Sequence, residues 1–193
     1  MIKKYLVTTA LFIIATIGYS NAQVGYSLKS YNIVIKGTSN IHDWSADVKK
    51  MGISSTLNFT DGSLVGIATA SVDIDATTLD ASEGSIMDGK MRDALKADKY
   101  PKITFTASNL AISGQATGEY TTNITGNLTI AGTTQRVSLP VKVRILANGE
   151  VEFSGSQKLK MTAFKVTPPT AMFGAMKTAD EITVNYLITL KKV

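Results

Sequence analysis

The sequence predicts an all-β fold in which one antiparallel sheet closes into a barrel. Apolar and polar residues alternate with a period of two through most of the 193-residue chain, and only one segment has the pattern of a helix. Turn signals, such as Asp61-Gly62, Ser113-Gly114 and Asn148-Gly149, separate the alternating segments. About eight or nine strands joined by tight turns favour a closed barrel over an open sheet, because closure removes unpaired strand edges.

The N-terminal segment has the pattern of an export signal. Lys3 and Lys4 precede an uncharged apolar run over residues 5–17, which is too short to span a bilayer. The following Ser20-Asn21-Ala22 resembles the small-residue site of signal peptidase. We therefore expect residues 1–22 to be a signal peptide, and residues 23–193 to form one mature domain that is periplasmic or secreted. The alternatives for this segment are a buried N-terminal strand or an uncleaved anchor.

The strands follow one another along the mature chain. Alternation is clearest in residues 120–130, where Tyr120, Ile124 and Leu128 share one face and threonines and asparagines occupy the other. This pattern is typical of a strand with one face toward the barrel interior. The same criterion predicts strands at residues 31–38, 44–50, 53–59, 64–74, 102–112, 137–145, 151–161 and 182–190.

One helix is predicted, over about residues 86–96. Met87, Met91 and Leu95 fall on one face of it, as expected for a helix that covers an apolar surface. Ser85 is the expected N-cap, and Pro101 prevents the helix from continuing.

Small residues recur on the inward faces of the predicted strands. Gly126 and Gly155 lie among large apolar neighbours. One predicted face of the 64–74 strand consists of Leu64, Gly66, Ala68, Ala70, Val72 and Ile74. Such a lining fits a narrow apolar tunnel. The alternative is that the glycines mark bulges or corners that curve the sheet.

Composition argues against several classes of function. The net charge of +5 falls to +3 once Lys3 and Lys4 are removed with the signal, and no basic tract occurs, so nucleic acid is not an expected partner. The chain has no cysteine, which excludes a disulfide framework, a thiolate nucleophile, a cysteine zinc site and a lipoprotein anchor.

No catalytic or metal constellation stands out either. A serine triad would have to use His42, the single histidine, yet no G-x-S-x-G motif occurs, and a histidine beside Asp43 is typical of a structural hydrogen bond. A metal site would need His42 with Asp73 and Asp75, but carboxylates two residues apart usually lie on a solvated strand face. We expect no enzyme activity, no metal and no cofactor.

Candidate ligand-binding residues are the large side chains at inward strand positions and one flexible apolar loop. Core packing accounts for the strand residues equally well, and the methionine-rich loop fits either an adaptable mouth or a plug at the barrel end. The predicted tunnel-lining residues are Phe105, Tyr120, Gly126, Phe153, Met161, Phe164, Met172, Phe173, Met176 and Tyr186. The predicted rim residues, which would meet a polar head group, are His42, Trp44, Lys165 and Lys177.

Four stretches of the chain resemble the YceI family. Residues 37–44 (GTSNIHDW) resemble the end of the first strand in its exported members, and residues 89–105 resemble the family's helix followed by its K-Y-P-x-I-x-F strand entry. Residues 126–137 resemble the G-x-L-T-I-x-G-x-T-x-x-V signature, and residues 161–184 resemble the last hairpin. The matches occur in family order and cover nearly all of the mature chain.

The resemblance implies a lipocalin-like extended barrel of eight antiparallel strands with an associated helix. It further implies that the interior binds a polyisoprenoid or another long amphipathic lipid. The family carries no agreed catalytic residues, so the resemblance assigns none to this chain. Transient membrane contact is expected of such a protein, and a homodimer is compatible with the sequence. A lipid carrier is the leading hypothesis; the alternatives are a filled barrel acting as an interaction or stress-associated module, and an enzyme.

Overall fold

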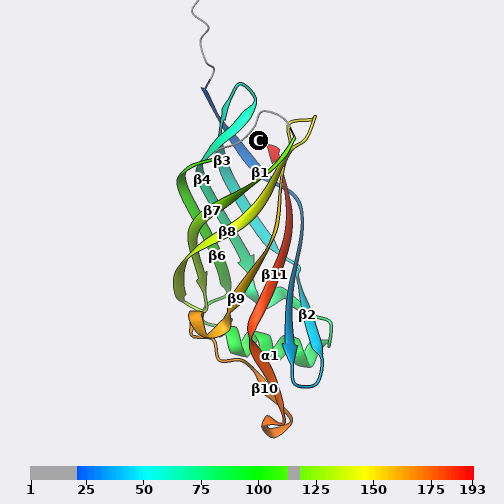
Figure 1. Ribbon diagram of the computed structural model, residues 1–193. Helices are drawn as coiled ribbons and strands as arrows, with labels where there is room; N and C mark the ends of the chain where they lie inside the picture. The colour runs from blue at the N-terminus through cyan, green and yellow to red at the C-terminus, as the bar shows by residue number, and fades with distance from the viewer. Residues whose placement is uncertain (1–20, 113–117) are drawn as a thin grey trace, which may run out of the picture.

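Eight strands of the chain form a closed antiparallel barrel. The computed structural model describes residues 21–112 and 118–193, so residues 1–20 of the predicted signal and the Ser113-Gly114 turn lie outside the described residues. The wall consists of β1 (Asn21–Ser39), β3 (Met51–Thr60), β4 (Ser63–Asp75), β6 (Lys102–Ala111), β7 (Glu119–Ile130), β8 (Thr133–Ile145), β9 (Val151–Lys160) and β11 (Met176–Lys192). Each strand pairs with the next in this order, and β11 returns to pair with β1, which confirms the predicted eight-stranded barrel (Figure 1).

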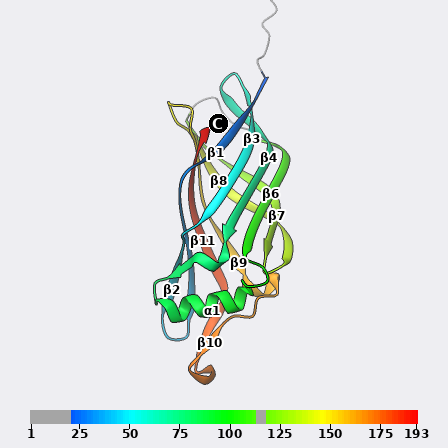
Figure 2. The same ribbon diagram turned by 180° about the vertical axis from the view of Figure 1, so that it is seen from behind.

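Short accessory elements gather at one end of the barrel. They are β2 (Asp43–Val48), β5 (Leu79–Ala81), β10 (Thr170–Ala171), the helix α1 (Ser85–Leu95) and the 3-10 helices η1 (Ala76–Thr78), η2 (Met161–Phe164) and η3 (Met172–Gly174). Residues 21–27 of β1 pair with β3, whereas residues 34–38 pair with β2. On this side of β1 the neighbouring strand therefore changes from β3 to β2 toward the helix. Helix α1 lies across this end, which we call the helix end (Figure 2).

The helix matches its predicted range to within one residue, but its N-cap differs from the prediction. Gly84 precedes the helix at φ 81°, no side chain caps the first turn, and Ser85 is already helical. Asp88 instead accepts a hydrogen bond from the backbone N–H of Ala81 at 2.8 Å, which ties the first turn to β5. Met87 and Met91 are buried, as the pattern predicts.

Register shifts in the β3–β4 hairpin change which residues of β4 face inward. The pairing shifts between Thr56 and Leu57 and again between Asn58 and Phe59, so Leu57 lies opposite Ile67, and both are buried. The predicted inward face was therefore wrong at Gly66, which pairs with Asn58 and with the exposed Ala111. Ile67 occupies the interior instead.

The end of the barrel opposite the helix is filled with side chains. Leu57, Leu64, Val143 and Val151 are completely buried there, and Tyr26 closes the same cluster with its hydroxyl donating to the Gly149 carbonyl at 3.0 Å. We call this the packed end. A second cluster, which includes Trp44, Met87 and Met91, lies under helix α1 at the helix end.

Candidate functional site

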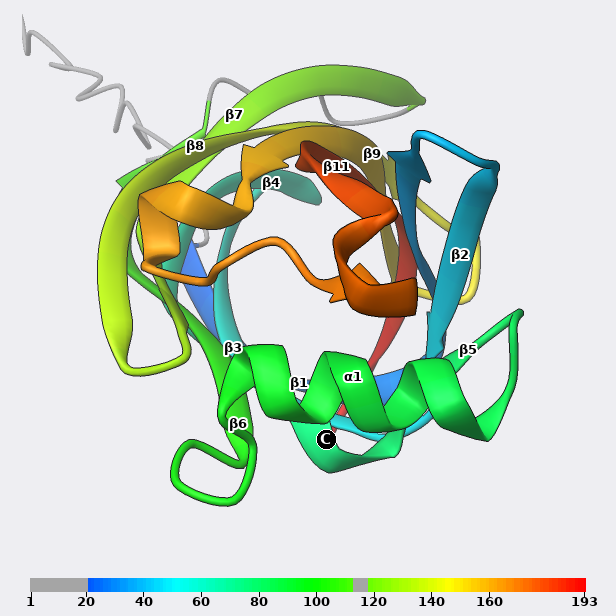
Figure 3. The same ribbon diagram turned by 90° about the horizontal axis from the view of Figure 1, so that it is seen from below.

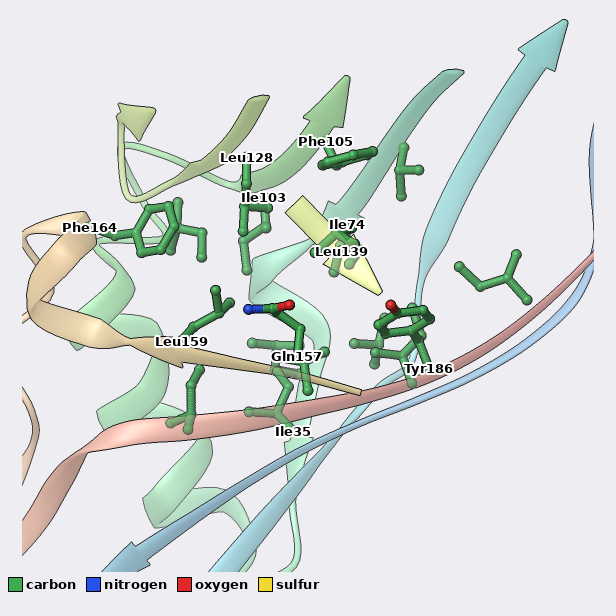
Figure 4. Close-up of a pocket in the computed structure, with 18 of the residues that line it drawn as sticks. Ile35, Ile74, Ile103, Phe105, Leu128, Leu139, Gln157, Leu159, Phe164 and Tyr186 are labelled. Atoms are coloured by element: carbon green, nitrogen blue, oxygen red, sulfur yellow. The ribbon is translucent and has the colours of Figure 1, made fainter. Parts of the chain in front are cut away.

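A cavity of about 270 Å³ lies inside the barrel between the packed end and the helix end (Figure 4). At about 30 Å³ per water molecule, space of this size admits roughly nine waters, or a segment of a chain-like ligand. Inward side chains of the barrel strands form most of the wall, and helix α1 and η2 complete it. Six of the barrel strands each contribute a labelled aliphatic side chain to the lining: Ile35, Ile74, Ile103, Leu128, Leu139 and Leu159.

Side chains in the middle of the barrel are only half buried although they line its interior. Val72, Ile103, Leu139 and Leu159 all line the cavity and all retain intermediate exposure. In a filled core they would be sealed as completely as Val143, which has no exposed surface. The barrel is therefore filled at one end and open in its middle.

Glycines on the wall make room for aromatic rings on the adjacent strands. A Cβ at Gly155 would stand 2.7 Å from Cζ of Tyr186, and one at Gly37 would stand 2.9 Å from Nε1 of Trp44. Gly126 is covered in the same way by Phe105. Neither Gly126 nor Gly155 lies at a register shift, so these glycines are not bulges, and the covered Gly126 is not an open stretch of tunnel wall.

Most polar groups on the cavity wall are already hydrogen-bonded to the backbone. The Tyr186 hydroxyl donates to the Pro140 carbonyl at 2.7 Å, and the Ser55 hydroxyl donates to the Thr69 carbonyl at 2.9 Å. Burial raises the pKa of Tyr186 to about 12, because the phenolate would lose its hydration. The wall therefore offers apolar contact nearly everywhere.

Gln157 is the exception on this wall. It lies on β9 in the same inward phase as Phe153 and Leu159, and its amide reaches into the cavity (Figure 4). Its Nε2 donates to the Lys158 carbonyl at 2.8 Å, whereas its Oε1 accepts no hydrogen bond from any residue in the described ranges. Gln157 was not predicted from the sequence, although its position in the β9 alternation was a sufficient signal.

The helix end is closed by non-strand segments. Phe164 of η2 and Val166 are buried, and the chain from Lys165 to Pro169 crosses the barrel opening (Figure 3). Asp180 of β11 holds η2 in place by accepting hydrogen bonds from the backbone N–H and the hydroxyl of Thr162 at 2.8 and 2.6 Å. These bonds lower the pKa of Asp180 from its ordinary value.

Comparison with known proteins identifies the family. The model of the YceI-like domain matches residues 19–190. The chain belongs to the YceI family. No curated protein matches it.

Solved structures share the fold of this YceI-family chain. BcnA from Burkholderia cenocepacia is 24% identical with a TM-score of 0.64, and the match covers 82% of this chain and 95% of BcnA. A polyisoprenoid-binding domain from Saccharophagus degradans is 14% identical with a TM-score of 0.66, covering 88% of this chain and 99% of that domain. The YceI protein of Campylobacter jejuni is 23% identical with a TM-score of 0.54, covering 100% and 99%.

The structure brings some of the predicted lining residues together and leaves others out. Tyr120 packs near the packed end with its hydroxyl 3.4 Å from the Leu64 carbonyl, and burial raises its pKa to about 12. Phe173 is fully exposed and Met176 is half buried outside the cavity wall, while the Met172 side chain lies outside the described residues. The predicted residues on the wall are Phe105, Phe153, Met161, Phe164 and Tyr186.

The predicted rim residues also separate into two groups. Trp44 is not at a rim but on the cavity wall, because Gly37 opposite it leaves space for the indole, whose Nε1 donates to the Thr38 carbonyl at 3.3 Å. His42 is exposed in the β1–β2 loop with Nδ1 2.9 Å from the Asp43 carbonyl. Lys165 and Lys177 are exposed at the helix end.

The described part of the chain holds neither a cluster of metal ligands nor a helix that could span a membrane. No group of three or more histidine, aspartate or glutamate side chains is placed to hold a metal ion there. Within the same ranges, no helix has the length and apolar character needed to cross a membrane.

Proposed function

We propose that this YceI-family protein is exported, and that it holds a polyisoprenoid or another long amphipathic lipid in the barrel interior as a carrier or store. The half-exposed apolar wall of the central cavity is the observation that carries this proposal, because such surface inside a fold is stabilised by an apolar guest. The shared fold of the Saccharophagus degradans domain, described as polyisoprenoid-binding, supports it.

The energetics favour a reversible carrier. Each buried methylene contributes about 0.8 kcal/mol relative to water, so one isoprene unit contributes several kcal/mol and a long chain far exceeds any usable affinity. The relevant competitor is the bilayer, whose interior is as apolar as the cavity wall. Transfer between the two is close to neutral, which allows both loading and release.

Lipid would enter at the helix end. The packed end is sealed by completely buried side chains such as Leu64 and Val143. At the helix end the cover is a short coil and one turn of 3-10 helix, which Asp180 holds through Thr162. Displacing these segments exposes the cavity without breaking the strand ladder.

Exposed apolar residues at the helix end favour transient membrane contact there. Phe173 at the tip beyond β10 is fully exposed, and Ile41 in the β1–β2 loop is 56% exposed. Asn40 joins the two loops, because its Nδ2 donates to the Ala175 carbonyl at 2.9 Å and its Oδ1 accepts from the Lys177 N–H at 2.8 Å. These hydrogen bonds hold the loop that carries Ile41 against the segment that follows Phe173.

The test is to express the full chain, purify the exported protein and extract it with organic solvent for mass spectrometry. We expect a long-chain isoprenoid or related amphipathic lipid in near-stoichiometric amount, and its displacement by an added polyprenyl probe. Protein that is repeatedly lipid-free and does not take up the probe would contradict the proposal and favour a ligand-free interaction module.

A further inference from the structure

Gln157 places an amide at mid-depth in an otherwise apolar cavity. Phe153 lies four positions before it in β9, toward the packed end, and Met161, the first residue of η2, lies four positions after it, toward the helix end. At about 3.3 Å per residue, it therefore lies roughly 13 Å from each. Its cross-strand partner is Val184, another lining residue.

The side-chain amide of Gln157 uses its nitrogen but not its oxygen in hydrogen bonds to the described residues. The bond from Nε2 to the Lys158 carbonyl fixes the orientation of the amide, so Oε1 is the atom left without a donor in the described part of the chain. Within the described residues, Oδ1 of Asn58 is the only fully buried side-chain polar atom without a hydrogen bond, so the unpaired Oε1 of Gln157 keeps some accessible surface, and the amide that carries it reaches into the cavity. A carbonyl oxygen among aliphatic side chains is stabilised by a hydrogen-bond donor from whatever fills that space.

The neighbouring polar groups cannot supply this donor. The hydroxyl hydrogen of Tyr186 is directed to the Pro140 carbonyl, and that of Ser55 to the Thr69 carbonyl. Lys160 is the one charged residue that borders the cavity in the described ranges, but it is exposed and lies beside η2 at the helix end. In the described part of the chain no side chain supplies the donor, which leaves water in the empty cavity or the ligand in the filled one.

We propose that Gln157 Oε1 accepts a hydrogen bond from a hydroxyl group of the bound lipid inside the barrel, so that the ligand is a neutral lipid alcohol whose polar end is enclosed. This inference rests on the proposed lipid-binding function and specifies the ligand's chemistry. A phosphorylated head group is disfavoured at this depth, because an ionised phosphate would be desolvated there without a cationic partner.

Three probes of one chain length test the assignment: a polyprenol, its methyl ether and its monophosphate. The ether keeps the oxygen but lacks the donor hydrogen. We expect the wild-type protein to bind the alcohol about 5- to 10-fold more tightly than the ether, and the monophosphate more weakly than the alcohol. Gln157→Met removes the acceptor at similar volume, so it should bind the alcohol and the ether equally.

Leu159→Met is the matched control, because it alters the same face of the same strand without touching a polar group; it should keep the preference for the alcohol. Equal binding of the alcohol and the ether by wild-type protein, or a preference that persists in Gln157→Met, would overturn the assignment while leaving lipid binding intact. The wild-type comparison decides the question even if the variant folds poorly. If wild-type protein binds none of the three probes, the proposed function itself fails.

Discussion

The ring of Phe105 on β6 occupies the space above Gly126 on β7. A Cβ at Gly126 would stand 2.6 Å from Cε2 of Phe105 and 2.5 Å from the carbonyl oxygen of Thr106. Tyr186 has the same relationship to Gly155 on β9. Because these rings lie over a neighbouring glycine, they lie along the wall instead of across the barrel. The cavity stays open although aromatic residues line it.

Replacing Gly126 with alanine should therefore destabilise the protein. The added methyl group would collide with the Thr106 carbonyl, which is backbone, and would push Phe105 into the cavity. We expect a loss of about 1–3 kcal/mol in the free energy of unfolding, measured by urea denaturation. Gly25→Ala is the control, because its Cβ would meet only Val193 at 3.9 Å. Equal stability of the two variants would contradict the close packing of Phe105 and Thr106 against Gly126.

The sequence was sufficient to predict the barrel, because alternation depends only on residues within one strand. The strand prediction failed where register shifts intervene. A shift between Leu28 and Ser30 changes the inward phase of β1, and the first part of that strand, with Val24 and Tyr26 facing inward, was not predicted. The register shift at Asn58 likewise changes which residues of β4 face inward. Such shifts are properties of strand pairing, which a single strand's sequence does not specify.

The candidate site was less predictable than the fold. Residues on the correct face of a strand, such as Phe153 and Tyr186, were identified from phase alone. Whether an inward residue meets a void or a packed neighbour depends on the opposite wall of the barrel. The alternation within one strand therefore could not distinguish Phe105, which lines the cavity, from Tyr120, which packs near the packed end. Trp44 was misplaced because its packing against Gly37 is a contact between two strands.

Enlarging a cavity residue should fill space without straining the fold. Leu139 of β8 lines the cavity and is half buried, so Leu139→Phe should unfold at nearly the wild-type temperature while binding a polyprenyl probe several-fold more weakly. Val143, four residues further along the same strand face, is completely buried at the packed end. Val143→Phe should overpack that core and lose about 1–3 kcal/mol. Thermal unfolding and probe titration measure both effects.

The pair of variants also separates an open barrel from a filled one. If Leu139→Phe loses as much stability as Val143→Phe, the middle of the barrel is packed in solution. If probe affinity is unchanged in a well-folded Leu139→Phe protein, the lipid does not occupy this cavity.

Stability should decline at high pH because of two partly buried tyrosines. Burial raises the pKa of Tyr120 and of Tyr186 to about 12, above the ordinary value of 10.0. Below pH 10 both states are neutral and stability is unaffected by these groups. Between pH 10 and about 12 the unfolded state loses protons that the folded state keeps, so stability falls by up to about 1.4 kcal/mol per pH unit for each tyrosine.

Tyr186→Phe should remove one of these contributions. We expect urea unfolding between pH 8 and pH 11.5 to show a shallower decline for the variant than for wild-type protein. Below pH 9 the variant should be less stable by a constant amount of about 0.5–1.5 kcal/mol, since it lacks the hydrogen bond to the Pro140 carbonyl. Parallel curves across the whole range would contradict the assigned pKa.

Export should produce a mature chain that begins at Gln23. Ser20-Asn21-Ala22 is the small-residue site that directly follows the apolar run, so cleavage is expected after Ala22. This would remove only the first two residues of β1, and the pairing of Gln23 with Asn58 would begin the mature strand. Intact mass and N-terminal sequencing of the protein from the extracytoplasmic fraction test the site. Uncleaved precursor in that fraction would show the prediction to be wrong.

The exposed apolar surface at the helix end should control delivery of lipid to membranes. Phe173 has a φ of 55°, an uncommon conformation for a bulky residue, and the tip presents its ring entirely to solvent. An aromatic ring at a loop tip is well suited to insert into the interface of a bilayer. Phe173→Ser should therefore slow transfer of a polyprenyl probe from the protein to lipid vesicles.

The same change should leave the cavity untouched, because Phe173 does not line it. We expect Phe173→Ser to retain wild-type affinity for the probe in the absence of vesicles and to unfold at the wild-type temperature, while its transfer rate falls several-fold. Ile41→Ser should act in the same direction, since Asn40 connects its loop to the tip. Leu187→Ser is the control, because Leu187 is also exposed, at 41%, but lies in the strand β11 and not in either loop. If Phe173→Ser and Ile41→Ser both transfer the probe as fast as wild-type protein and the Leu187→Ser control, the helix end is not the surface that meets the membrane.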